Sequence, residues 1–112
     1  MKKLLLAALF ASSSASAGVG SGTGKITELY TNASGSIARI QFSAAIKNPD
    51  NCGKSTFYMV ELNDSAGSNR FYSTLLAAHA AQKDVSFWVH GCTNGTYWGG
   101  TQPKITDIYF KQ

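Results

Sequence analysis

One segment of this chain carries a helical pattern of apolar residues, and the segments on either side of it alternate. The segment is 69–83 (NRFYSTLLAAHAAQK), and its apolar stripe follows the i, i+3, i+4, i+7 spacing of an amphipathic helix. The stripe residues are Tyr72, Leu75, Leu76 and His79. Ser68 or Asn69 is the expected N-cap, and Lys83 suits the C-terminal end of the helix dipole. A single helix among strands restricts the fold to a small, mainly β class.

Five short segments rich in β-branched and aromatic residues are predicted to be strands. They span 25–32, 36–46, 56–62, 84–92 and 103–111. Alternation assigns a core-facing set to three of them. This set comprises Ala38, Ile40, Phe42, Ala44 and Ile46, then Tyr58, Val60 and Leu62, and then Val85, Phe87 and Val89. Trp88 and His90 are expected to face outward.

The expected order is therefore strand, strand, strand, helix, strand, strand. This order favours the five-stranded Greek-key barrel called the OB-fold, with its helix between strands three and four. The similar segments KITELY (25–30) and KITDIYF (104–110) are then the first and last strands. In both, an Ile and the next large apolar residue stand three apart, which breaks strict alternation and indicates a β-bulge or a tight barrel bend.

The first 17 residues have the layout of a secretory signal peptide. Two lysines precede a short apolar run, and A-S-A precedes the expected cleavage after Ala17. The run is too short to span a bilayer. Residues 18–24 are predicted to be a flexible, Gly-rich lead-in, and residues 25–112 a single domain. The mature protein is expected in the periplasm or outside the cell.

Charge argues against several partners. Removal of Lys2 and Lys3 with the signal leaves eight Lys and Arg against six Asp and Glu, a net charge of about +2. This weak excess does not favour nucleic acid or an anionic membrane. Residues 87–102 include no Lys or Arg, although a nucleic-acid site there would need cations to follow the phosphates. No membrane insertion is expected.

The two cysteines, Cys52 and Cys92, are predicted to form a disulfide, because an exported chain meets an oxidising compartment. The bridge would close a loop of about 40 residues, which the chain-entropy model values at roughly 4 kcal/mol. The alternative, a zinc site that adds His79 and His90, lacks the closely spaced ligand pairs of such sites. No cofactor or metal is expected.

Catalysis has little support in the sequence. His79 lies on the helix stripe, where a hydrogen-bonded packing role is expected, and no GxSxG nucleophile motif is present. Paired cysteines leave no free thiol nucleophile. The protein is therefore predicted not to be an enzyme; an enzyme or metal protein that uses His79 and His90 is the remaining alternative.

A ligand site is predicted within 87–100 (FWVHGCTNGTYWGG), which contains both tryptophans and four glycines. In an OB-fold this segment forms strand four and part of the usual ligand surface. The proposed ligand-binding residues are Trp88, His90, Asn94, Tyr97 and Trp98. Exposed aromatic rings can stack on a sugar, and amides can bond its hydroxyls. Alternatively, the two tryptophans cover one end of the barrel or a subunit interface.

The spacing of GKITELY, NPDNC, FYSTLLAAHAAQKDVSFWVHGC and PKITDIYF resembles a group of short, uncharacterised exported proteins of Gram-negative bacteria. In topology the chain also resembles the OB-fold binding (B) subunits of AB-type bacterial toxins. That resemblance implies a small exported domain with one disulfide, assembled into a pentameric ring that binds cell-surface glycans.

Two functions follow as expectations. The first is a secreted or periplasmic binding module for glycan, similar to a toxin B subunit. The second is a protein-interaction module, such as an inhibitor of a lysozyme or a protease, in which residues 93–102 plug the active site of the partner.

Overall fold

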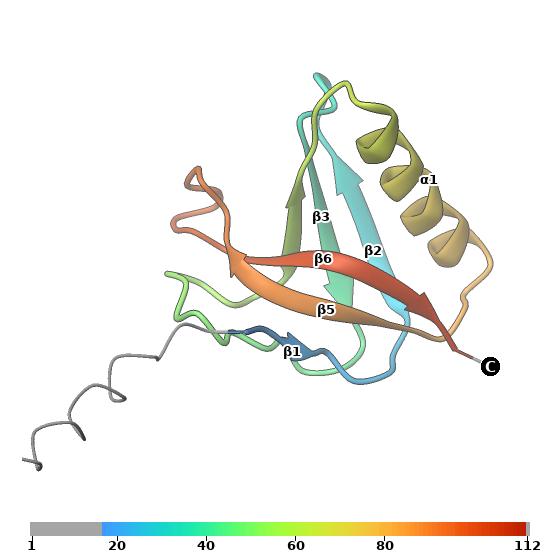
Figure 1. Cartoon of the computed structure of the whole chain (residues 1–112), viewed down its shortest axis with the longest axis horizontal. Coiled ribbons are helices and arrows are strands. Elements are labelled where there is room, and N and C mark those ends of the chain that lie inside the picture. Colours follow the sequence, from blue (N-terminus) through green and yellow to red (C-terminus); the bar gives the residue numbers. More distant parts are fainter. Residues whose placement is uncertain (1–16, 112) are drawn as a thin grey trace, which may run out of the picture.

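A computed structural model of the chain describes residues 17–111 (Figure 1). Its elements are β1 (Val19–Gly20), β2 (Ile26–Thr31), β3 (Ile37–Phe42), β4 (Tyr58–Glu61), α1 (Ala66–Ala80), β5 (Val85–Cys92) and β6 (Pro103–Phe110). The strands form one open sheet in the order β1-β5-β6-β4-β3-β2. Neighbouring strands are antiparallel except for the parallel pair β4 and β6. The predicted mainly β fold with one helix is confirmed. The signal-peptide prediction lies outside the described residues except for Ala17.

The sheet has six strands and not the predicted five, because the segment expected to be a flexible lead-in supplies β1. Val19 and Gly20 pair with Val89 and Trp88 of β5. The Ser21 side chain is buried, and its hydroxyl oxygen accepts a hydrogen bond from the backbone N–H of Phe87 at 2.8 Å. Residues 18–24 have little apolar content, so their order comes from backbone pairing that the amino-acid pattern does not reveal.

The bulges predicted in the two similar segments are confirmed. In β2 the register shifts between Ile26 and Glu28, and in β6 it shifts between Ile105 and Asp107. The extra residue is therefore the threonine of K-I-T in both cases. Each preceding isoleucine enters the main core, Ile26 at 1% and Ile105 at 3% exposure. The repeated motif thus marks two strands that bend in the same way at the same core.

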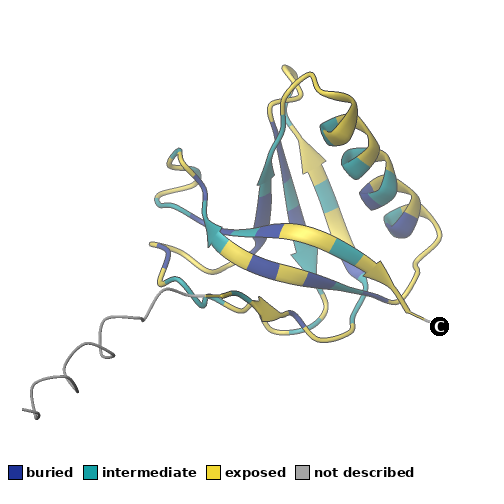
Figure 2. Ribbon diagram, in the orientation of Figure 1, coloured by how far each residue is buried: buried dark blue, intermediate teal, exposed yellow. Residues whose placement is uncertain are grey.

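The main core lies between the inner face of the sheet and α1. Figure 2 shows buried and exposed residues alternating along β5, as its sequence predicts. The buried members are Ile26, Ile40, Tyr58, Leu75, Ala78, Val85, Phe87, Val89 and Ile105. The buried hydroxyl of Tyr58 accepts a hydrogen bond from the backbone N–H of Lys47 at 2.9 Å. A second, smaller cluster of Ile37, Phe57 and Met59 lies on the outer face of β3 and β4.

The helix begins three residues before the predicted start. Ser65 is the N-cap, because its hydroxyl oxygen accepts a hydrogen bond from the Ser68 N–H at 3.0 Å. The helix ends at Ala80, since Gln82 has a φ of 50° and leaves the helical path. Leu75 is buried as predicted, whereas Leu76 is 48% exposed. The helix therefore buries a narrower stripe than the sequence pattern indicates.

The predicted Cys52–Cys92 disulfide is present and joins the loop before β4 to the end of β5. Its formation removes both thiols from the alternative zinc site. Among residues 17–111, no helix combines the length and apolar character that a bilayer span requires.

Replacing Cys52 and Cys92 with serine is expected to lower the free energy of unfolding by roughly 4 kcal/mol. The reason is that the unfolded chain regains the entropy of a loop of 40 residues. Urea denaturation of the oxidised protein and the double variant measures the difference. The unaltered protein in reductant is the control and should lose a similar amount. Equal stability with and without the bridge would contradict the prediction.

Candidate functional site

The loop between β5 and β6, residues 93–102, forms a tight hairpin with Trp98 at its tip. The backbone N–H of Thr93 donates to the Gln102 oxygen, and that of Tyr97 donates to the Gly100 oxygen, both at 2.9 Å. Trp98 and Gly99 occupy the two central positions of the turn with φ of 53° and 96°. Glycine adopts this left-handed conformation freely, whereas for tryptophan it costs about 1 kcal/mol. Other contacts must therefore hold Trp98 in this position.

Gln102 holds the hairpin from inside. Its side chain is fully buried, and its Nε2 donates to the backbone oxygens of Tyr97 at 2.6 Å and Gly100 at 3.4 Å. The Thr93 hydroxyl oxygen accepts from the Gln102 backbone N–H at 3.0 Å. These bonds add to the reciprocal backbone bonds between Tyr97 and Gly100 and tie both sides of the turn to one buried side chain. Gln102 is thus part of the loop framework.

Glu61, at the end of β4, fastens the loop to the sheet. Its carboxylate accepts hydrogen bonds from the backbone N–H groups of Asn94 at 2.9 Å and Gly95 at 3.1 Å, and from the Tyr97 hydroxyl at 3.3 Å. Hydrogen bonds to a charged acceptor are stronger than neutral ones. Tyr97 in turn packs on the outer cluster of Ile37, Phe57 and Met59.

Arg39, on the outer face of β3, is surrounded by three aromatic side chains. Its guanidinium carbon lies 5.1 Å from the centroid of Tyr30, 4.9 Å from that of Phe57 and 4.6 Å from that of Trp98. The Trp98 ring meets Tyr30 at 81° and Phe57 at 86°, so the rings form walls at right angles. Arg39 Nη2 also bonds Glu28 at 2.7 Å. Such cation–π contacts contribute roughly 0.5–2 kcal/mol each and fix the indole.

The Trp98 side chain is only partly covered. Arg39 lies over its indole, and the residue is 48% exposed. Tyr30 beside it is 36% exposed. Together they form an aromatic surface whose geometry is set before any ligand arrives. We call this pair the Tyr30–Trp98 surface.

The five residues proposed from sequence fall into two groups. Asn94, Tyr97 and Trp98 lie together in the 93–102 loop, where the first two contact Glu61. Trp88 and His90 lie on the outward-facing side of β5. Among residues 17–111, no ring contact joins Trp88 to Trp98. His90 faces Asp50, with 3.9 Å between Nδ1 and Oδ2.

Sequence reasoning missed the residues that orient the loop, namely Tyr30, Arg39, Phe57 and Glu61. Tyr30, Arg39 and Glu61 come from three strands, and Phe57 directly precedes β4. All four lie far from the loop in sequence. Alternation indicates that Arg39 faces outward, but no local signal states which loop folds over it. The one signal available in the sequence is that Arg39 pairs across the strands with an aromatic residue, Tyr30.

The described part of the chain contains no cluster of metal-ligand residues. Within residues 17–111, no three His, Cys, Asp or Glu side chains lie together as a metal site requires. The packing role expected for His79 is confirmed, since its Nδ1 lies 3.0 Å from the backbone oxygen of Ile26.

Comparison with protein-family models, with curated proteins and with solved structures found no match to this chain. Function must therefore be argued from the site itself.

Glu61→Ala is expected to speed hydrogen exchange at the Asn94 and Gly95 amides by about tenfold, because both N–H groups lose a charged acceptor. Exchange followed by NMR at residue resolution measures this. Asp107→Ala removes an exposed carboxylate from β6 and is the matched control, with no change expected at the two amides. Unaltered protection in Glu61→Ala would show that the carboxylate does not hold the loop.

The Tyr97 phenol is expected to titrate above its ordinary pKa of 10.0, because burial, the charge of Glu61 and the hydrogen bond to Glu61 all raise its pKa. The folded state favours the neutral phenol. Its stabilisation is therefore complete below the ordinary pKa and is lost as pH rises through the folded pKa. Glu61→Gln should lower the Tyr97 pKa, whereas Asp64→Asn should not. NMR titration of the Tyr97 ring tests both, and an equal pKa in all three proteins would contradict the prediction.

Proposed function

We propose that this chain is an exported, non-enzymatic binding module whose Tyr30–Trp98 surface binds glycan. One observation carries the proposal: Trp98 is half exposed although it is held in a costly left-handed turn and backed by Arg39. Backbone strain combined with an exposed ring is typical of a ligand contact. A merely structural tryptophan would gain more by turning inward.

The strand arrangement supports an OB-fold as the framework of this module. Strands β2, β3, β4, β6 and β5 are neighbours in that order, β4 and β6 are parallel, and α1 lies between β4 and β5. In OB-folds the loop that corresponds to 93–102 contributes to oligosaccharide or oligonucleotide surfaces. Under this assignment β1 is an added pairing segment ahead of the first barrel strand.

The chemistry of the surface favours glycan over nucleic acid. Arg39, whose guanidinium lies over the indole, already pairs with Glu28, so it is a poor phosphate contact. An indole face suits the apolar C–H face of a sugar ring. The Asn94 amide and the Tyr30 hydroxyl provide neutral donors and acceptors for hydroxyl groups. Because the loop is ordered before binding, little entropy is lost when the ligand arrives.

Trp98→Ala is expected to weaken binding on a glycan array by at least about tenfold, since the stacking ring is lost. Trp88→Ala is the matched control: Trp88 is a second exposed tryptophan, on β5, and its loss should leave binding unchanged. Circular dichroism confirms that both variants are folded. The proposal fails if Trp98→Ala binds as tightly as the unaltered protein, or if the array shows no glycan binding to the intact protein.

A protein partner is the second candidate, because Tyr, Trp and Arg are the residues enriched at interface hot spots. The tight 93–102 hairpin is rigid enough to occupy the active site of a lysozyme or a protease. Inhibition of either enzyme class at micromolar protein, lost in Trp98→Ala, would favour this candidate over glycan. Light scattering tests the pentamer that the toxin resemblance implies, and a monomer would remove that part of the proposal.

A further inference from the structure

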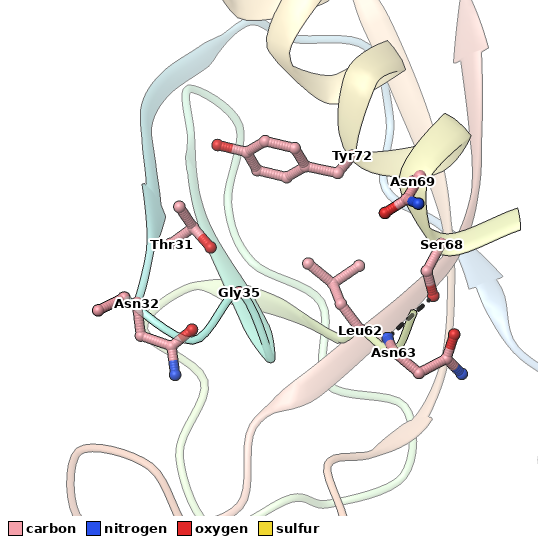
Figure 3. A pocket seen from close by; sticks show the side chains of 9 residues that line it. Thr31, Asn32, Gly35, Leu62, Asn63, Ser68, Asn69 and Tyr72 are labelled. Carbon is pink, nitrogen blue, oxygen red and sulfur yellow. Dashed lines mark hydrogen bonds between the residues drawn. The ribbon is translucent and has the colours of Figure 1, made fainter. Parts of the chain in front are cut away.

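A hollow lies at the end of the sheet near the start of α1, away from Trp98. Its volume is about 320 Å³, and it is bounded by the β2–β3 turn, the chain after β4, and the first turns of α1 (Figure 3). Tyr30 and Thr31 are consecutive in β2, but Tyr30 contacts Trp98 whereas Thr31 lines this hollow. The hollow is thus separate from the Tyr30–Trp98 surface.

The polar groups around the hollow are amides and hydroxyls. Figure 3 shows the Tyr72 ring extending from α1 toward the side formed by Thr31, with the apolar side chain of Leu62 below it. Asn69 and Ser68 lie beside Tyr72 on the helix, and Asn63 lies at the end of the chain that leaves β4.

Several of these groups have hydrogen-bonding capacity to spare. Within residues 17–111, neither the Tyr72 hydroxyl nor the side-chain amide of Asn69 has a hydrogen-bond partner. Asn63 uses its Oδ1 to accept from the Ser65 N–H at 2.9 Å, which leaves its Nδ2 for a ligand. The Ser68 hydroxyl oxygen accepts from the Asn63 N–H at 3.1 Å, which leaves its own proton to donate. Both donors and acceptors are therefore available in the lining beside the Tyr72 ring.

The lining includes no charged side chain. An ionic ligand would lose its hydration without gaining an opposite charge, which is unfavourable. A neutral ligand rich in hydroxyl groups loses nothing of this kind, because amides and hydroxyls both donate and accept. A volume of about 320 Å³ falls at the lower end of small-molecule sites and fits one sugar ring with its first-shell water.

We infer that this hollow is a second binding site, for a single neutral saccharide unit, with Tyr72 and Asn69 as its principal contacts. The inference does not depend on the Tyr30–Trp98 surface. It adds a site and names the ligand class as an uncharged, hydroxyl-rich ring.

The test is an NMR titration of the folded protein with methyl glycosides of glucose, galactose, mannose and N-acetylglucosamine. We expect at least one to shift the amide signals of 31–35, 62–63 and 68–72 in a saturable way. Tyr72→Phe and Asn69→Ala should each raise the dissociation constant about fivefold, the effect of one lost hydrogen bond. Tyr109→Phe removes a hydroxyl from an exposed tyrosine on β6 and should have no effect.

Trp98→Ala separates this inference from the proposed function. The shifts around Tyr72 should persist in that variant even though array binding through the indole is lost. The inference is overturned if shifts occur only in the 93–102 loop, if no sugar produces shifts, or if Tyr72→Phe and Asn69→Ala bind as tightly as the unaltered protein. Tighter binding of a carboxylated sugar such as sialic acid would overturn the assignment of a neutral ligand.

Discussion

Both edges of the sheet depend on hydrogen bonds from one short segment of backbone. Residues 19–24 pair with β5, ending in the reciprocal bonds between Gly24 and Val85, and Lys25 then begins the pairing with β3 through Ser43. The chain thus passes from one edge of the sheet to the other at Gly24–Lys25. Unpaired edges are the part of a sheet most prone to wrong association. Here residues 19–24 cover the side of β5 that would otherwise be an edge, and Ile26 enters the core immediately afterwards.

Two charged side chains on the outer face of the sheet hold the 93–102 loop in place. They do not pair with each other. Glu61 accepts hydrogen bonds from two backbone N–H groups and one hydroxyl of the loop, while Arg39 packs against the indole at the tip of the loop. Their contacts offset a strained tryptophan that costs about 1 kcal/mol. The loop is therefore ordered during folding. The glycan proposed to bind at Trp98 would therefore lose little entropy to the ordering of the loop.

The sequence predicted what depends on periodicity and missed what depends on distant backbone. Alternation in β5 placed Val85, Phe87 and Val89 in the core, and the three-residue spacing in both K-I-T segments located the bulges. β1 was missed because a two-residue strand carries no period. Its pairing is supplied by β5. The helix start was misplaced because Ser65, Ser68 and Asn69 are all good caps, and tertiary contacts choose among them. The Arg39 and Trp98 contact joins strand and loop residues that no local pattern relates.

The two proposed contacts are small, and this size has a consequence for how the protein would act. One exposed indole and one hollow for a single sugar are contacts of the kind that bind at about millimolar concentration, or roughly 4 kcal/mol. Useful affinity for a cell-surface glycan then requires several contacts at once, through effective concentration and not through new interactions. Tyr30 and Thr31 are adjacent in β2 and therefore point to opposite faces of the sheet, so the two contacts of one chain would meet different glycan branches or chains. Repetition around a ring of identical chains would supply several copies of each contact, which links the glycan proposal to the assembly that the toxin resemblance implies.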